Sequence, residues 1–300
     1  MRLLCVFVAM MLLSLPAMAQ ETILPLWPNG NPEPSKVVGP EIDPTTDANR
    51  IVSGKVTVRV TNVSRPSLTV YPPKGKNSGA AALVFPGGAY IRLAYNIEGT
   101  EVCDWLNSIG MTCVLVKYRV PEEGHYPANV EDLEDAQQAM RLTREHAAEW
   151  RIDPQRIGVI GFSAGAHLAV VLSTHPDFQG KNLPPSTIDA RPDFQMVIYP
   201  GWLAGAAGNV DPSVAPNAQV PPTFLVQAGN DYTAHVENVL VYFEALKNAH
   251  VPAELHVYTE GGHGFGMRPT ELPISHWGSV AETWLHTIHI LGPPGVVGMP

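Results

Sequence analysis

The sequence is poor in charged residues, and basic residues are the scarcer kind. Charged residues make up 16% of the 300 residues against 45% apolar residues, a balance that argues against a disordered chain or a coiled coil. The chain has 19 lysines and arginines and 28 aspartates and glutamates, which gives a formal net charge of −9. Because an acidic surface repels phosphate backbones and anionic membranes, nucleic acid is not expected as a partner and a neutral ligand is easier to accept.

Long apolar runs are also missing, except at the N-terminus. The run from Leu3 to Leu15 is shorter than the roughly 20 residues that a membrane-spanning helix needs. It follows the basic Arg2 and precedes Ala17-Met18-Ala19, which together form the pattern of a secretory signal peptide. We therefore expect residues 1–19 to be cleaved after Ala19 and the protein to be secreted or periplasmic, with a retained membrane anchor as the alternative.

Cysteine is scarce, with three residues in the chain. Cys5 lies in the expected signal peptide, which leaves Cys103 and Cys113 in an oxidising compartment. They flank one short connection and could form a disulfide, but both also lie in apolar patterns where cysteine acts as a small hydrophobe. The sequence leaves both states open, and neither cysteine is placed like a catalytic thiol.

The chain divides into a lead-in, one domain and a tail. Residues 20–50 are rich in Pro, Asn and Asp and are expected to form an irregular lead-in on the surface. Residues 51–291 are expected to form one catalytic domain, and residues 292–300 a disordered tail. Val56–Val60 and Ser67–Tyr71 alternate between apolar and polar residues, which predicts an antiparallel pair at a sheet edge.

After this pair, strand and helix patterns alternate. This order predicts the α/β class, with a mostly parallel central sheet and helices on both faces. The Gly-, Ala- and Pro-rich stretch Gly201–Pro222 has no clear period and is a candidate lid or rim loop. The predicted buried strands are Ala81–Phe85, Met111–Tyr118, Arg156–Phe162, Phe194–Tyr199, Thr223–Gln227 and Leu255–Tyr258; the predicted helices are Glu98–Leu106, Asn129–Trp150, one from Ser163, His235–Asn248 and Ser275–Leu291.

One serine stands in a turn motif that predicts a nucleophile. Gly161-Phe162-Ser163-Ala164-Gly165 fits the pattern G-x-S-x-G, which is weak evidence alone because it can arise by chance. Here, however, a predicted buried strand ends and a helix begins, as the motif requires. The glycines let the two backbones approach closely, and the serine should be held in a strained conformation with its hydroxyl exposed. A serine that only caps the helix is the alternative.

A serine nucleophile needs a base, and His263 is the best candidate among eleven histidines. It stands in the glycine-rich Gly261–Gly266, which follows the last predicted strand and can bend sharply. His167 is expected to pack or to form a hydrogen bond in the helix after Ser163. His286 and His289 lie three residues apart on the last helix but lack a third ligand, so no metal or cofactor is expected.

The third member must be a carboxylate that orients the imidazole. Asp231 ends the loop Ala228-Gly229-Asn230-Asp231 after a predicted strand. All three candidates then lie just past the carboxyl ends of strands, where parallel α/β sheets place their sites. A helix N-cap is the alternative role for Asp231. Glu260 is the alternative acid, but it is too close to His263 in the same tight loop to be favoured.

Backbone donors must stabilise the oxyanion of the tetrahedral intermediate. One is expected at Ala164, the residue after the nucleophile. The others are expected at Gly88 and Ala89, in the turn Pro86-Gly87-Gly88-Ala89-Tyr90 that follows an early buried strand. An ordinary turn is the alternative. On weaker grounds, Tyr90 and Trp202 are candidate ring surfaces for the substrate.

These motifs together resemble those of the α/β-hydrolase esterases, and most of all the bacterial exported group often called acetyl xylan esterase or xylanase-like. The resemblance covers about Ile51 to Leu291 and implies the α/β-hydrolase fold with a short lid. Two features depart from it. Pro86 and Ala89 replace the His and the last Gly of a His-Gly-Gly-Gly turn, although the backbone donors survive. Tyr232-Thr233-Ala234-His235 stands where relatives more often carry a proline.

The resemblance and the motifs imply a serine esterase that works through an acyl-enzyme. We expect short-chain acyl esters as substrates, above all acetyl groups on hemicellulose or xylo-oligosaccharides. We thus expect the protein to bind a small-molecule or glycan ester and to have no stable membrane anchor. The oligomeric state stays open. Alternatives are a feruloyl-type or general carboxylesterase, an arylformamidase, a peptidase, and a non-catalytic carbohydrate-binding protein. A glycosidase would need two carboxylates flanking the bond, and no such pair is obvious.

Overall fold

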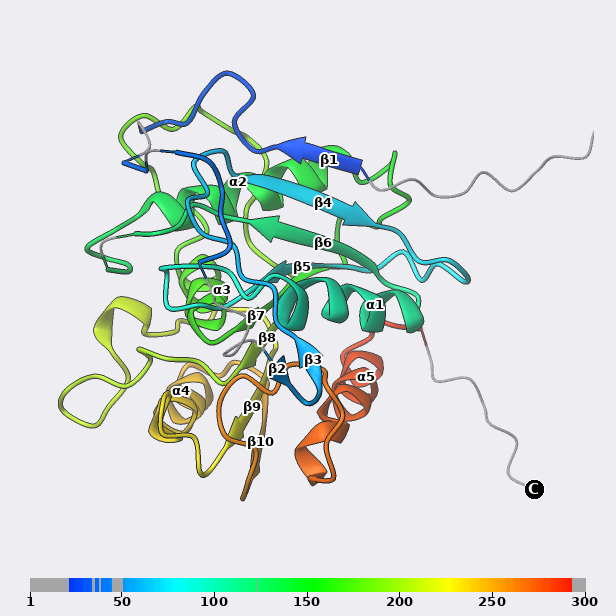
Figure 1. Ribbon diagram of the computed structural model, residues 1–300, viewed down its shortest axis with the longest axis vertical. Coiled ribbons are helices and arrows are strands. Elements are labelled where there is room, and N and C mark those ends of the chain that lie inside the picture. The colour runs from blue at the N-terminus through cyan, green and yellow to red at the C-terminus, as the bar shows by residue number, and fades with distance from the viewer. Residues whose placement is uncertain (1–21, 34–35, 38, 45–50, 123, 293–300) are drawn as a thin grey trace, which may run out of the picture.

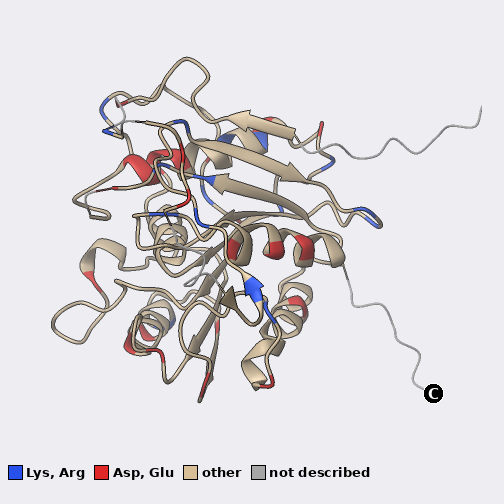
Figure 2. Ribbon diagram, viewed as in Figure 1, with Lys and Arg blue, Asp and Glu red and all other residues tan. Residues whose placement is uncertain are grey.

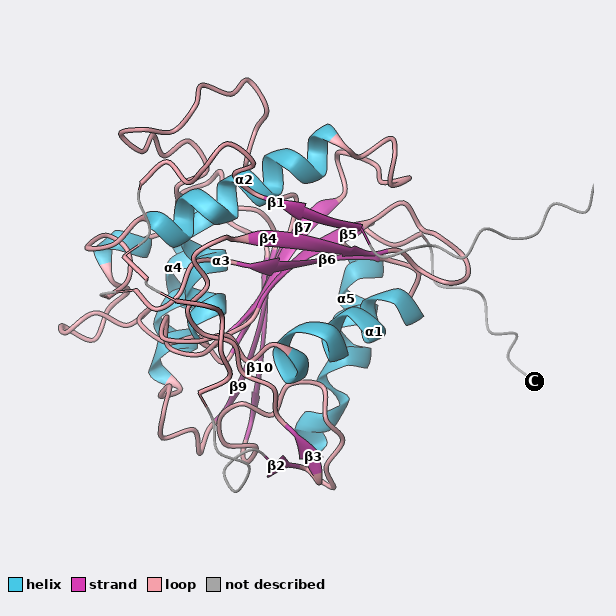
Figure 3. Cartoon of the chain, turned by 45° about the horizontal axis from the view of Figure 1, so that its top comes forward, coloured by secondary structure: helices cyan, strands magenta, loops and turns pink. Residues whose placement is uncertain are grey.

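The computed structural model describes residues 22–33, 36–37, 39–44, 51–122 and 124–292. A large sheet of eight strands crosses the molecule, and helices cover both of its faces (Figures 1 and 3). This is the predicted α/β-hydrolase architecture, with a mixed sheet that is mostly parallel. The expected signal peptide and nearly all of the expected tail lie outside the described residues.

The sheet has the strand order β1-β4-β6-β5-β7-β8-β9-β10. The first two strands run antiparallel to their neighbours, and all pairs from β6 to β10 are parallel. The central strands are buried along their whole length, which explains their continuous apolar runs. The strands are β1 (Thr22–Pro25), β4 (Ser67–Tyr71), β5 (Ala81–Phe85), β6 (Thr112–Lys117), β7 (Ile157–Phe162), β8 (Gln195–Ile198), β9 (Thr223–Ala228) and β10 (Ala253–Tyr258).

The two faces of the sheet carry separate hydrophobic cores. One face packs against α2, α3 and α4, and the other against α1 and α5 (Figure 3). The other helices place one apolar face on the sheet, whereas α3 is buried along nearly its whole length. The helices are α1 (Glu101–Ser108), α2 (Glu131–Glu145), α3 (Ala164–Thr174), α4 (Glu237–Asn248) and α5 (Trp277–Thr287), with the short turns η2 (Asn96–Thr100), η3 (Pro212–Val214) and η4 (Pro273–His276).

Two expectations for the N-terminal region are wrong. The lead-in is not irregular throughout, because Thr22–Pro25 forms β1 and pairs with β4 at the sheet edge. Val56–Val60 does not pair with β4. Instead β3 (Lys55–Val56) pairs with β2 (Ile51–Val52) in a separate two-stranded sheet. Alternation in a short segment predicts a strand but does not identify its partner.

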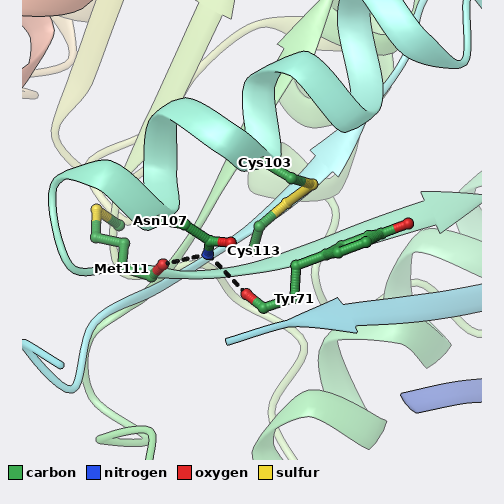
Figure 4. The surroundings of a disulfide bond; sticks show 5 residues. All are labelled: Tyr71, Cys103, Asn107, Met111 and Cys113. Atoms are coloured by element: carbon green, nitrogen blue, oxygen red, sulfur yellow. Dashed lines mark hydrogen bonds between the residues drawn. A yellow bond between two sulfur atoms is a disulfide. The ribbon is translucent and has the colours of Figure 1, made fainter. Parts of the chain in front are cut away.

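Cys103 and Cys113 form a disulfide, which settles the question that the sequence leaves open. The bond joins α1 to β6 (Figure 4). Both cysteines are buried. Next to it, the Asn107 side chain donates hydrogen bonds to the carbonyl oxygens of Tyr71 and Met111. The start of β6 is therefore tied to α1 by covalent and polar contacts together.

Charged residues lie mainly on helices and loops, and the strands of the large sheet carry few of them (Figure 2). In the described part of the chain, no helix is long and apolar enough to cross a bilayer. The carboxyl ends of the parallel strands form one edge of the sheet, and the turns after β5, β7, β9 and β10 lie together there. This edge holds the residues considered next.

Candidate active site

Ser163 occupies a sharp turn between β7 and α3. Its backbone has φ +52° and ψ −117°. This conformation is strained and persists only where the surrounding structure holds the residue in place. A Cβ on Gly161 would lie 2.0 Å from the Gly165 carbonyl oxygen, and one on Gly165 would lie 2.0 Å from the Phe85 oxygen. These contacts confirm why the motif needs glycine on both sides of the serine.

Three side chains from three separate turns form one hydrogen-bonded line. The Ser163 Oγ lies 2.9 Å from His263 Nε2, and His263 Nδ1 lies 2.7 Å from Asp231 Oδ2. Ser163 follows β7, Asp231 follows β9 and His263 follows β10, as the chain order predicts. The carboxylate that reaches the imidazole is that of Asp231, whereas the alternative acid Glu260 is exposed.

The environment of Asp231 keeps its carboxylate charged. The side chain is buried, and its Oδ1 accepts hydrogen bonds from the N–H groups of Thr233 and Ala234. Burial alone would raise the pKa of Asp231, but the hydrogen bonds from His263, Ala234 and Thr233 outweigh burial and hold the pKa below its usual value. A charged acid at this position favours the Nδ1–H tautomer, which leaves Nε2 free to take a proton from serine.

A neighbouring amide holds the histidine turn in place. Asn230 Oδ1 accepts hydrogen bonds from the N–H groups of Gly261 and Gly262, at 3.0 and 2.9 Å. Sequence reasoning does not assign this role to Asn230, although the residue stands directly before Asp231. The loop after β9 thus supplies both the acid and the support for the base.

The turn after β5 has an unusual backbone that suits anion binding. Gly88, Ala89 and Tyr90 have φ values of +133°, +57° and +58°, and a Cβ on Gly87 would lie 2.7 Å from the Ser163 Cβ. Within the described residues, the N–H groups of Gly88, Ala89 and Ala164 have no acceptor in the protein. They are therefore available as the donors that an oxyanion beside Ser163 would need.

A buried carboxylate that the motifs do not include supports this turn. Glu98 Oε2 accepts a hydrogen bond from the Gly87 N–H at 2.7 Å, and its Oε1 accepts one from the Tyr199 hydroxyl at 2.9 Å. The Tyr199 hydroxyl also accepts from the Gly266 N–H, and the tyrosine ring packs 5.0 Å from the His263 ring. Burial raises the pKa of Glu98 against the lowering effect of these hydrogen bonds. Glu98 therefore links the anion-binding turn to the histidine turn.

The expectation that Tyr90 offers a ring to the substrate is wrong. Its side chain is 2% exposed and its hydroxyl lies 2.8 Å from His167 Nδ1. The positive φ of Tyr90 turns the ring inward, where it packs against the ring of Trp202 at 5.7 Å. His167 is buried as well, and burial lowers its pKa to about 3, so it stays neutral and forms the expected hydrogen bond.

Two pockets flank Ser163. The larger, of about 640 Å³, is lined by Trp202 together with residues from the loop after Asp231, and Trp202 is 39% exposed. The smaller, of about 290 Å³, is lined by His263, Gly88 and Ala89 as well as Ser163. The stretch Gly201–Pro222 contributes Gly201, Trp202 and Ala204 to the wall of the larger pocket.

The geometry suits nucleophilic attack on a carbonyl group. It places a hydroxyl, an imidazole and a charged carboxylate in line, beside unused backbone donors. In the described part of the chain, no three His, Cys, Asp or Glu side chains come together as candidate metal ligands. The residues at this edge of the sheet can therefore carry out acyl transfer by proton handling and oxyanion stabilisation.

Two family models match successive parts of the chain. The model described as BD-FAE matches residues 68–198, and the model of the prolyl oligopeptidase family matches residues 206–275. The first range contains the serine turn and the turn after β5. The second contains the acid and histidine turns.

The similar proteins include an acetylxylan esterase from Xylanibacter ruminicola, which is 31% identical over 71% of this chain and 46% of its own length. An endo-1,4-beta-xylanase B from Butyrivibrio fibrisolvens is 27% identical over 71% of this chain and 36% of its own length. The chain thus spans less than half the length of these two curated relatives. A crystal structure of an acetyl ester-xyloside bifunctional hydrolase from Caldicellulosiruptor lactoaceticus is 32% identical, with a TM-score of 0.71 over 90% of this chain and 97% of that one.

Proposed function

The chain belongs to the α/β-hydrolase esterases related to acetylxylan esterase, and on this premise we propose that it hydrolyses short-chain acyl esters with Ser163 as nucleophile. One observation carries the proposal: the hydrogen-bonded line from Ser163 Oγ through His263 to Asp231, with distances of 2.9 and 2.7 Å. Both distances lie within the range of proton transfer between side chains.

In the first half of the reaction, Ser163 attacks the ester carbonyl while His263 Nε2 takes the hydroxyl proton. The charged Asp231 stabilises the imidazolium that forms. The N–H groups of Gly88, Ala89 and Ala164 have no other acceptor in the described residues, and they stabilise the oxyanion by donating hydrogen bonds to it. His263 then gives its proton to the leaving alcohol, and an acyl-enzyme on Ser163 results.

In the second half, water replaces the alcohol. His263 takes a proton from the water, which attacks the acyl-enzyme carbonyl, and the same backbone donors stabilise the second oxyanion. Collapse of this intermediate returns the proton to Ser163 and releases the carboxylic acid. The cycle uses side chains and backbone of this chain and needs no redox step.

We propose acetyl groups on hemicellulose or xylo-oligosaccharides as the natural substrates. Support comes from the similar proteins, which include an acetylxylan esterase and an acetyl ester-xyloside bifunctional hydrolase. The proposed export of the chain also supports it, because glycans of this kind lie outside the cell.

A peptidase is the second candidate, because the prolyl oligopeptidase family model matches residues 206–275. That range holds the acid and the base but neither the nucleophile nor the anion-binding turn, so the match is equally compatible with an esterase. A feruloyl-type esterase, a general carboxylesterase and an arylformamidase would use the same residues and differ only in the groups that the two pockets accept.

The test compares wild type with Ser163→Ala on 4-nitrophenyl acetate, 4-nitrophenyl octanoate, acetylated xylan and a peptide anilide. We expect the acetate esters to be hydrolysed and kcat to fall by at least about 10⁴-fold in the variant, as for removal of a serine nucleophile in general. Ser279→Ala is the matched control, since Ser279 is exposed on α5 and its hydroxyl only caps a local carbonyl.

Three outcomes would contradict the proposal. Hydrolysis of the anilide but not of the esters would favour the peptidase. A faster reaction with octanoate than with acetate would exclude the short-chain preference. Full activity of the Ser163→Ala protein would remove Ser163 from the mechanism.

A further inference from the structure

Two arginines line the smaller pocket. Neither forms an ion pair in the part of the chain that the structure describes, although the charge of Arg59 is close enough to lower the pKa of Glu98. Arg59 and Arg92 are partly buried and lie in the same wall as His263 and Ser163. The ion pairs among the described residues involve other cations, such as Lys117 and Arg268. The chain has 28 acidic and 19 basic residues, and these two guanidiniums lie beside the proposed nucleophile.

Backbone pairing holds the two arginines at this place. Val60 and Leu93 exchange two hydrogen bonds, at 2.9 and 2.7 Å, and the Tyr95 N–H donates to the Val58 carbonyl. Arg59 lies within the first of these segments and Arg92 directly precedes the second. The Arg92 carbonyl also lies 2.1 Å from where a Cβ on Gly88 would be, so its main chain packs on the anion-binding turn.

The charges in this pocket do not cancel. Glu98 is the acidic residue that lines it, and both of its carboxylate oxygens already accept hydrogen bonds, from Gly87 and Tyr199. One engaged carboxylate faces two guanidiniums whose donors are unused within the described residues. The pocket therefore presents an excess of positive charge and several free N–H donors to whatever enters it.

The position of His263 shows which half of an ester would lie there. His263 must protonate the leaving oxygen, so the alcohol portion has to lie in the pocket that His263 lines. The larger pocket beside Trp202 is lined by Ser163 and Ala89 but not by His263. This step rests on the proposed esterase function.

We propose that the arginine-lined pocket binds a carboxylate carried by the alcohol portion of the ester, such as a uronic acid substituent on an acetylated glycan. A guanidinium matches the planar carboxylate with two parallel hydrogen bonds. Because the arginines are partly buried, solvent and salt screen this attraction less than they would on an open surface. The pocket would then select acidic glycan esters over neutral ones for the same acyl group.

The experiment uses two acetyl esters of similar size, 4-acetoxybenzoate and its neutral amide 4-acetoxybenzamide. We measure the ratio of kcat/KM for 4-acetoxybenzoate to kcat/KM for 4-acetoxybenzamide. The ratio of each variant is divided by the ratio of wild type, so that the intrinsic reactivity of the two esters and any general loss of activity cancel. We expect Arg59→Gln and Arg92→Gln each to lower the ratio about fivefold. For wild type, the ratio should fall as NaCl is raised from low to about 1 M.

Arg65→Gln is the matched control, because Arg65 is exposed and lines a different cavity; it should leave the ratio unchanged. Acetylated xylo-oligosaccharides with and without a glucuronic acid substituent repeat the comparison on glycans. If both esters are hydrolysed and the ratio is the same in wild type and both pocket variants, the proposed carboxylate site is wrong while the proposed function stands. Failure of wild type to hydrolyse any of these esters would instead overturn the proposed function.

Discussion

At the scale of single residues, Glu98 connects two parts of the site that are far apart in sequence. Its carboxylate accepts from Gly87 on one side and from Tyr199 on the other, and Tyr199 in turn contacts both Gly266 and the His263 ring. Glu98 lines the smaller pocket but forms no hydrogen bond with Ser163, and both of its oxygens are engaged by Gly87 and Tyr199. It is a positioning residue, and its effect should appear in the chemical step rather than in binding.

We expect Glu98→Ala to lower kcat for 4-nitrophenyl acetate about tenfold while KM changes little, because one loosened oxyanion donor costs less than the roughly 10²–10³-fold of a deleted one. Glu98→Gln should recover most of the activity, since an amide can accept from Gly87 and still pair with the Tyr199 hydroxyl. Steady-state kinetics with a thermal melt of each variant checks this. If both variants lower the melting temperature but retain wild-type kcat, Glu98 is only structural.

The residues of the triad could be predicted because each stands in a short local pattern. Ser163 and His263 lie between glycines, and Asp231 ends a loop after a strand. Glu98 belongs to no such pattern, since its partners are set by how β5 and β8 end in space. The prediction for Tyr90 is wrong for a similar reason. Its ring lies against His167 in a turn where Tyr90 has a positive φ, and sequence does not reveal the direction of a side chain in an irregular turn.

At the scale of elements, the buried strands and long helices follow from hydrophobic period, and their bounds differ by a few residues. The predicted helix Asn129–Trp150 is shorter as α2 (Glu131–Glu145), because the chain turns irregularly after it. β1 could not be predicted from its own four residues. It exists because β4 offers an open edge with which a nearby extended segment can pair.

The disulfide acts at the same scale. It joins two cysteines that are ten positions apart in the sequence, one in α1 and one in β6. α1 directly follows the η2 turn that holds Glu98. Cross-linking a loop of this length restricts the unfolded chain and adds about 2–3 kcal/mol to the free energy of unfolding.

We therefore expect the double variant Cys103→Ala/Cys113→Ala to lose about that much stability, measured by urea unfolding. Wild type treated with a reductant should lose a similar amount, while the double variant should not respond to the reductant. Equal stability of wild type with and without reductant would show that the bond contributes nothing to folding.

At the scale of the whole molecule, the position of β1 is compatible with the proposed export. β1 begins at Thr22, three residues after the predicted cleavage site at Ala19, so removal of residues 1–19 would leave the sheet edge intact. The buried disulfide supports the same proposal, because such bonds persist in oxidising compartments. Cleavage and bond formation should then occur together in the exported protein.

Expression of the full chain in a Gram-negative bacterium tests this. We expect the periplasmic fraction to contain active protein whose first residue is Gln20, as read by intact mass and N-terminal sequencing. Ala17→Lys/Ala19→Lys should block cleavage, because the peptidase pocket accepts only small residues at these positions. That variant should stay with the membrane at its full mass. Full-length wild type held in the membrane would instead mean that the apolar run is a permanent anchor, and the enzyme would then work at the membrane surface rather than free in the periplasm.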